Sequence, residues 1–469
     1  MEVVANKSTR QSKEAGVLNS FRDSLHRARQ QQGLCFSALL SEEAINQAFG
    51  SARYLWQGWI YTPAVTVWVF LSQCLSPDHS CRDAVARLMT WQVAQGRKAC
   101  SPDTGAYCSA RDALPETACQ ELVRITGRQL EEEAPKEWLF HGRRIRVVDG
   151  STITMPDTAE NQAEYPQQSG QKPGCGFPIA RILVVFSLSV GAVLETVISK
   201  YHGKLTGENS LLRTIHHQFE QDDIVVADRC FSGWFDLALL QDRWVDVVMR
   251  KHQARHTDFR KGTRLGPNDH LVHWRKPNRP EWMTVEQYQV LPDKLLVREV
   301  RIVVRQRGFR PRVIIVVTTL LDPEEFSQED LADLYRRRWQ AELNLRSLKV
   351  VMQMDHLRCK TPHRVRNEYY MHLVAYNLVR RVMALAADEH AITPDKISFK
   401  GTLQTLNQFL PLLTTSMPVN EGCAAILQCA VAQQVGRRPD RVEPRLVKRR
   451  PKQYKWLMKP RHEYKTRAA

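Results

Sequence analysis

The sequence predicts an α/β protein in which a mixed β-sheet is flanked by helices, with a helical N-terminal domain and a β-rich insertion. Residues from Phe36 to about Leu130 have helical periodicity. Short apolar runs, typical of buried strands, then alternate with helical patterns. A basic segment with β-like ends, residues 251–310, interrupts that alternation before its last helix. These three observations together predict the fold class.

The length of 469 residues corresponds to about three domains at ~150 residues each. The first 30 residues are polar, and we expect them to be disordered. The units expected after them are a helical domain over 31–135, a core formed by 136–250 and 311–390, the insertion over 251–310, and a helical region with a basic tail over 391–469.

Two helices of the N-terminal domain carry local signals. Ser80, followed by Asp83, resembles an N-terminal cap. Apolar residues follow at helical spacing until Gly96 ends the run. A further helix is expected over residues 117–133.

The pattern becomes β-type near residue 144. The run RIRVVD is predicted to be a strand that ends at Asp149, and IVVA a strand that delivers Asp228. Between them, residues 180–201 contain two apolar runs that turn at Val190 and Gly191, which predicts a hairpin.

The remaining core elements continue the alternation. Ser327, with Asp330 at the capping-box position, opens one long helix that is expected to run to about Met354. The other expected elements are helices over 207–219 and 231–243, and strands over 245–250 and 312–320.

Positive charge is concentrated in two segments. The chain has 67 Lys and Arg against 50 Asp and Glu, a net charge of +17. Residues 251–310 carry a net +8 and residues 436–469 a net +10, so the remainder is close to neutral. Such patches favour a polyanionic partner, either nucleic acid or an acidic membrane surface. For the C-terminal segment, a solvated basic tail is the alternative interpretation.

Neither a membrane span nor export is expected. The apolar stretches fall short of the ~18–20 residues that a helical span needs. The first residues are polar and lack a hydrophobic signal core. The 11 cysteines are scattered without a C-x-x-C pair, which favours reduced thiols and a cytoplasmic location.

Two carboxylates stand at expected strand ends. Asp149 follows RVV and Asp228 follows IVVA. Ligand sites of open α/β sheets lie beyond the carboxyl ends of strands. Two carboxylates leaving adjacent strands would repel each other unless a cation lay between them, and Mg²⁺ is the usual choice. The alternative is that each Asp caps the turn that follows it.

A third carboxylate, Glu342, lies on the long helix. At 100° per residue, Tyr335, Arg338, Glu342 and Lys349 fall within about 60° of one another. One helix face thus carries a tyrosine, two cations and a carboxylate. The alternative is a solvated face with an Arg338–Glu342 pair at i,i+4 spacing.

These residues resemble a known family. The spacing Tyr335-x2-Arg338-x3-Glu342-x6-Lys349 matches the Y-R-E-K signature of the insertion-sequence-four family of bacterial DDE transposases at all four positions. VVDG at Asp149 and VVADRCFSGW around residue 228 resemble the two acidic boxes of that family. The segments TGAYCSARDALP and KTPHRVRNEYYMHLVAYNLVRR are also similar, so the resemblance covers about residues 104–461.

The resemblance implies an RNase H-like (retroviral integrase-like) core. In that core Asp149, Asp228 and Glu342 would be the catalytic residues and would bind two Mg²⁺ (or Mn²⁺) ions. Activated water, in-line geometry and stabilised leaving-group charge are what a two-ion site supplies to phosphodiester hydrolysis.

The resemblance also assigns DNA-binding residues. Tyr335, Arg338 and Lys349 would hold phosphates of the transposon end. In cut-and-paste relatives a tryptophan of the insertion stacks beside a flipped base, and Trp274 and Trp282 are the candidates here. Ordinary packing is the alternative for either tryptophan.

The function implied is that of a cut-and-paste transposase. It would bind the terminal inverted repeats, cleave DNA at the element ends and join the freed 3′-OH to target DNA. Two chains would pair two ends as a homodimer in a synaptic complex, in the bacterial cytoplasm and at the nucleoid, without a membrane. Two alternatives remain: a catalytically inactive DNA-binding derivative, and an RNase H-fold nuclease without strand transfer.

Overall fold

The computed structural model describes residues 39–51, 60–304, 312–413, 417–435, 457–460 and 463. The segment expected to be disordered, residues 1–30, lies outside this part of the chain, as does most of the basic tail. Within the described residues, no helix is both long enough and apolar enough to cross a membrane.

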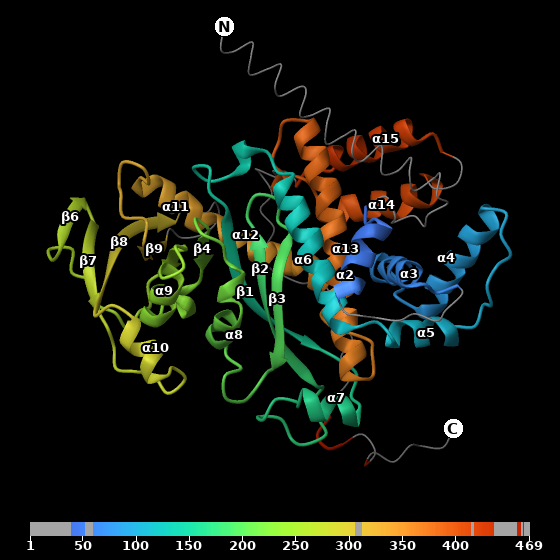
Figure 1. Ribbon diagram of the computed structural model, residues 1–469, viewed down its shortest axis with the longest axis horizontal. Coiled ribbons are helices and arrows are strands. Elements are labelled where there is room, and N and C mark those ends of the chain that lie inside the picture. Colours follow the sequence, from blue (N-terminus) through green and yellow to red (C-terminus); the bar gives the residue numbers. More distant parts are fainter. Residues whose placement is uncertain are drawn as a thin grey trace, which may run out of the picture.

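A mixed nine-stranded sheet organises the molecule (Figure 1). Its strand order is β3-β2-β1-β4-β5-β9-β8-β7-β6. Strands β1, β4 and β5 are parallel, and every other neighbouring pair is antiparallel. The strands are β1 (Ile145–Thr154), β2 (Ile179–Ser187), β3 (Val193–Lys200), β4 (Ile224–Ala227), β5 (Asp246–Arg250), β6 (Thr263–Gly266), β7 (Asp269–Arg275), β8 (Lys294–Val304) and β9 (Arg312–Thr318).

The expected hairpin and strand positions are confirmed. β2 and β3 pair as an antiparallel hairpin, and Gly191 in the turn adopts φ +73°, a conformation that glycine allows without strain. β4 ends immediately before Asp228. β1 corrects the prediction, because it does not end at Asp149 but continues to Thr154. Those last residues are largely polar, yet they remain paired with β2, with Asp149 opposite Val184.

Helices precede the sheet in the chain. They are α2 (Glu42–Ser51), α3 (Pro63–Leu75), α4 (Cys81–Ala94), α5 (Gly105–Asp112) and α6 (Glu116–Glu132). The predicted cap is confirmed, since the Ser80 hydroxyl accepts a hydrogen bond from the Asp83 amide. The helix expected over 117–133 is α6, and Gly96 follows α4 with φ +68°.

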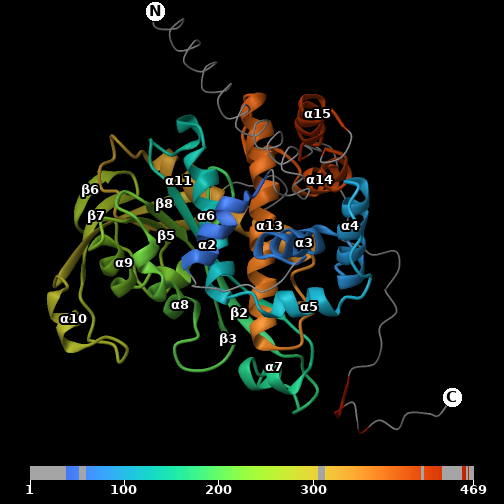
Figure 2. The same ribbon diagram turned by 45° about the vertical axis from the view of Figure 1, so that its right-hand side comes forward.

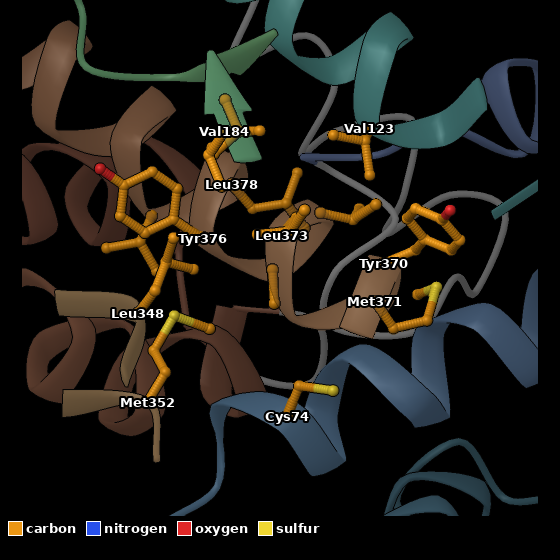
Figure 3. Packing of buried hydrophobic residues seen from close by; sticks show 14 of the residues in the cluster. Cys74, Val123, Val184, Leu348, Met352, Tyr370, Met371, Leu373, Tyr376 and Leu378 are labelled. Carbon is orange, nitrogen blue, oxygen red and sulfur yellow. The ribbon is translucent and has the colours of Figure 1, made fainter. Parts of the chain in front are cut away.

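A long helix, α13 (Pro362–Glu389), joins these helices to the sheet. Figures 1 and 2 show it standing between the sheet and α3. Figure 3 shows its Leu373 and Leu378 beside Val184 of β2, with Val123 of α6 nearby. These residues belong to one apolar cluster, which also takes in Val147 of β1. We call the side of the sheet that packs on this cluster the α13 face.

The opposite side of the sheet packs on a second apolar cluster. It is covered by α8 (Glu208–Thr214) and α9 (Trp234–Gln241), which pack on residues such as Val148 and Ala227. Both helices are shorter than predicted, because 3-10 turns flank them: η2 (His216–Gln218) follows α8 and η3 (Arg229–Phe231) precedes α9. We call this side the α9 face.

Residues 251–310 add strands to the same sheet. β6, β7 and β8 extend it beyond β9, and the short α10 (Val285–Val290) lies between β7 and β8. Arg298 of β8 links these strands to the segment before α11. Its buried guanidinium donates to both Asp269 carboxylate oxygens and to the Phe326 carbonyl.

The segment predicted as one long helix is divided. Ser327 and Asp330 form the expected capping box at the start of α11 (Gln328–Arg337). The helix then tightens at Arg338, where the amide bonds to the carbonyl three residues back. It resumes as α12 (Trp339–Arg346) and ends in the π-helical turn η4 (Ser347–Val351). The other described helices are η1 (Lys136–Trp138), α7 (Ala159–Glu164), η5 (Pro394–Lys396), α14 (Phe399–Leu413) and α15 (Val419–Ala432).

Candidate functional site

Asp149 lies on β1, and Asp228 directly follows β4, the neighbouring parallel strand. β1 and β4 are parallel, with Val147 opposite Val226, and the two aspartates stand two residues further along. Because side chains alternate between the faces of a sheet, both aspartates share the α13 face with these valines. The ladder ends two residues before the aspartates, so they leave adjacent strands at the same edge of the sheet.

Glu342 approaches the same face from α12, which packs against β1. Its Oε1 accepts a hydrogen bond from Arg338 Nη2 at 2.9 Å. The Glu342 side chain is 37% exposed, whereas that of Arg338 is 15% exposed. The structure therefore sets Glu342 and the largely buried Arg338 near Asp149, and the charge of Asp228 also reaches Arg338.

The pKa values of Asp149 and Arg338 both depend on neighbouring charges. Burial raises the pKa of Asp149 to about 6, against the lowering effect of Arg338, and the negative charges of Glu342 and Glu208 add to the rise. Burial alone would lower the pKa of the Arg338 guanidinium, but Tyr335, Glu342 and both aspartates together raise it. Arg338 is thus a counter-charge for all three carboxylates.

Tyr335 lies buried beside Arg338, whose guanidinium carbon is 5.9 Å from the ring centroid. Burial raises the pKa of this tyrosine to about 12, and the nearby charge of Asp228 contributes. The phenol is therefore protonated at neutral pH and can donate a hydrogen bond.

Lys349 reaches β1 from η4. Its Nζ lies 3.1 Å from Ser151 Oγ and 2.9 Å from a carboxylate oxygen of Asp355. Ser151 is two residues after Asp149 on the same strand, so Lys349 and Asp149 share the α13 face. Tyr335, Arg338 and Glu342 thus lie near the aspartates and Lys349 contacts the same strand as Asp149, although the helix that carries them is divided.

Carboxylate oxygens are the donors that Mg²⁺ prefers, so the chemistry of these three side chains fits a divalent ion. In the described part of the chain, however, no three His, Cys, Asp or Glu side chains are grouped so that they could hold a metal. Arg338 contacts Glu342 instead, so side-chain rearrangement would have to accompany metal binding.

Trp274 and Trp282 lie in residues 251–310 and pack on the α9 face. Trp274 is 6% exposed, and its indole N–H donates to Glu299 Oε1 at 2.8 Å. Trp282 is half-buried, with the Arg213 guanidinium 3.9 Å from its ring centroid. The structure does not bring either ring to the face that carries the carboxylates.

A fourth carboxylate at the site, Glu208, was not selected by sequence reasoning. It begins α8 and lies against Gly150, where an added Cβ would be 2.4 Å from its Cδ. The sequence offered only the glycine after Asp149 as a signal, because this contact depends on how α8 packs under β1.

Comparisons with known proteins converge on one family. A family model described as "Transposase DDE domain" matches residues 140–378. The chain is 26% identical over 361 residues to transposase InsG for insertion sequence element IS4 of Escherichia coli K12, a match that covers 74% of this chain and 77% of the relative.

Two further comparisons were found. The chain is 24% identical over 277 residues to the putative transposase InsL for element IS186A of E. coli K12, covering 53% of this chain and 68% of the relative. A cryo-EM structure of the piggyBac transposase synaptic complex with hairpin DNA aligns over 84% of both chains, at 10% identity and a TM-score of 0.42.

Proposed function

Because the chain belongs to the IS4 family of DDE transposases, we propose that Asp149, Asp228 and Glu342 are the metal-binding carboxylates of its catalytic site. The protein is a transposase, an enzyme that cleaves DNA and transfers strands. Enzymes of this family use divalent metal ions. The observation that carries the proposal is the parallel pairing of β1 and β4, which puts Asp149 and Asp228 just beyond the same end of the ladder, while α12 with Glu342 packs against β1.

We propose that the three carboxylates hold two Mg²⁺ or Mn²⁺ ions. When bound, such ions supply an activated attacking oxygen and stabilise the charge on the leaving oxygen. The pairing order of β3-β2-β1-β4-β5, an antiparallel hairpin followed by parallel strands, supports an RNase H-like core around this site.

The basic and aromatic neighbours of the carboxylates are proposed to bind DNA. Arg338 and Lys349 place two cations beside the aspartates, where they can hold phosphates of the transposon end. Tyr335 can donate a hydrogen bond to a phosphate, because it is protonated at neutral pH. Of the two insertion tryptophans, Trp282 is the more exposed and is our candidate for stacking on a flipped base.

The wider assembly is also part of the proposal. The substrates would be the terminal inverted repeats of an insertion sequence and then target DNA, to which the 3′-OH is joined. The helical region over 31–135 would help to recognise the ends, and two chains would pair two ends as a homodimer. The net charge of +17 supports an extended DNA interface, and we place the protein at the bacterial nucleoid.

The decisive experiment incubates the full chain with a labelled element end, target DNA and Mg²⁺. Asp149→Asn, Asp228→Asn and Glu342→Gln are each expected to lower cleavage by at least about 1000-fold while end binding persists. Asp157→Asn, an exposed aspartate just beyond β1, is the matched control and should cleave normally.

The products distinguish the alternatives. Strand-transfer products support the transposition reaction, whereas nicking without joining indicates a nuclease, and binding without cutting indicates an inactive derivative. If any one of the three carboxylate variants cleaved at the rate of the control, its assignment as a metal ligand would be wrong.

A further inference from the structure

Glu208 and Asn209, at the start of α8, contact the backbone beside both aspartates. Glu208 packs on Gly150, the residue after Asp149, so closely that an added Cβ would lie 2.4 Å from its Cδ. Its Oε2 lies 3.8 Å from the Cys230 sulfur, and Asn209 Nδ2 donates to the Cys230 carbonyl at 2.6 Å. Cys230 belongs to η3, the turn that follows Asp228. One short segment therefore bridges the two catalytic strands from the α9 face.

This bridge lies where the pairing between the strands stops. The ladder of β1 and β4 has its last pair at Val147 and Val226, two residues before the aspartates. Asp149 is still held by β2, but Asp228 already belongs to the turn after β4. The β1–β4 hydrogen bonds consequently do not fix the separation of the two carboxylates.

A partly buried partner holds Glu208 in place. Arg181 of β2 lies with its Nη1 3.3 Å from Glu208 Oε1, and the Arg181 guanidinium carbon is 4.8 Å from the centre of the Tyr201 ring. The Glu208 side chain is 29% exposed. Its carboxylate is thus directed at Gly150 by an ion pair from the neighbouring strand.

Building on the function proposed above, we propose that Glu208 and Asn209 are positioning residues for the metal site. Glu208 fixes the backbone at Asp149–Gly150, and Asn209 fixes the turn after Asp228. Together they set the separation of the two aspartates, on which the binding of a shared divalent ion depends. Glu208 also adds negative charge next to Asp149, which increases the attraction for a cation.

The test measures metal affinity separately from activity. Mn²⁺ binding to the full chain without DNA is followed by calorimetry, and end cleavage is followed across a Mg²⁺ titration. Residues that orient metal ligands typically change metal affinity by about 10- to 100-fold when they are replaced. We therefore expect Glu208→Ala to weaken Mn²⁺ binding and raise the half-saturating Mg²⁺ concentration by about tenfold or more.

Two further variants sharpen the test. Glu208→Gln keeps the contact with Gly150 but removes the charge, so it should recover part of the affinity; it also provides the measurement if Glu208→Ala does not fold. Glu220→Ala removes an exposed carboxylate that pairs with Arg144, and this matched loss of charge should leave Mn²⁺ binding unchanged.

The outcomes separate this inference from the proposed function. If Asp149→Asn abolishes cleavage but Glu208→Ala has the metal dependence of Glu220→Ala, Glu208 is not a positioning residue. Equal losses of end binding and cleavage in Glu208→Ala, with normal Mn²⁺ affinity, would show a merely structural role and overturn the inference as well. If Asp149→Asn cleaves normally, the proposed catalytic site itself fails.

Discussion

Arg338 supplies positive charge to the carboxylate site. Its guanidinium donates to Glu342 and interacts with both aspartates, so it balances negative charge that would otherwise be unopposed. Arg338→Ala should therefore lower end cleavage by about 100-fold, the effect expected from losing a charged, largely buried hydrogen-bond donor at a reacting phosphate. Arg338→Lys should recover only part of the rate, because lysine lacks the planar fork of donors.

The measurement is single-turnover cleavage of a labelled element end at saturating protein. Arg337→Ala removes the neighbouring cation of the same run and serves as the control for lost charge. Equal rates for Arg338→Ala and Arg337→Ala would contradict the role given to Arg338.

At the scale of single residues, the sequence identified candidate site residues where charged side chains follow predicted strands or occur at a characteristic spacing. Asp149, Asp228 and Glu342 could be selected because two followed apolar strands and the third lay in the Y-R-E-K pattern; in the structure β1 and β4 pair in parallel and α12 packs against β1. Glu208 could not be selected, because its relation to Gly150 exists only once α8 has packed under β1.

Gly127 determines how closely α6 can pack on β3. A Cβ at this position would lie 2.2 Å from the Val193 carbonyl oxygen. Since that oxygen belongs to the backbone of a buried strand, it cannot move aside without disturbing the sheet. Gly127→Ala should therefore lower the free energy of unfolding by about 1–3 kcal/mol, despite the higher helix propensity of alanine.

Urea denaturation measures this change, and Gly50→Ala is the matched control. Gly50 lies in α2 with no heavy atom within 4 Å of an added Cβ, so alanine there should stabilise the helix by about 0.5–1 kcal/mol. Stabilisation of both variants would show that α6 and β3 are not in the close contact described.

At the scale of elements, periodicity and caps predicted the type of each core segment but not all of its limits. The cap of α4 and the hairpin of β2 and β3 were found from local signals. The extension of β1 was missed because it depends on pairing with β2, which is distant in the sequence. The break at Arg338 was missed because it depends on a hydrogen bond within one turn, and the residue pattern there is that of a continuous helix.

At the scale of the whole molecule, buried histidines should make the fold acid-sensitive. Burial lowers the pKa of His372 to about 3, and the positive charges of His79, Arg358 and Arg111 contribute; burial likewise lowers the pKa of His79 to about 4. In the unfolded chain a histidine takes up a proton below about pH 6.5, whereas these two buried histidines stay neutral in the folded chain until the pH is much lower. The stabilisation is therefore complete above about pH 6.5 and declines as the pH falls toward the folded pKa values.

Because His372 is protonated only in the unfolded chain, lowering the pH from 7 to 5 should reduce the free energy of unfolding by about 2 kcal/mol through this residue alone. The check compares denaturant unfolding of the wild type and His372→Asn at both pH values, because acidic groups with raised pKa values act in the opposite direction. The wild type should lose more stability than the variant. Equal losses would mean that His372 is not held neutral in the fold.

The sequence located a basic, β-rich segment but could not show that its strands continue the central sheet. β5 pairs with β9, β9 with β8, and β8 with β7, so the sheet runs without interruption from the carboxylates to β6. β5 and β9 lie far apart in the chain, on either side of the insertion, and pairing across such a distance leaves no local sequence pattern.

An unbroken sheet has a mechanical consequence. Twisted strands held by continuous hydrogen bonds bend far less readily than two bodies joined by a linker, and the buried Arg298 stiffens the span. The outer β6–β7 hairpin is therefore coupled to the strands that carry the carboxylates through one continuous hydrogen-bonded sheet, and the two ends of that sheet are expected to move together.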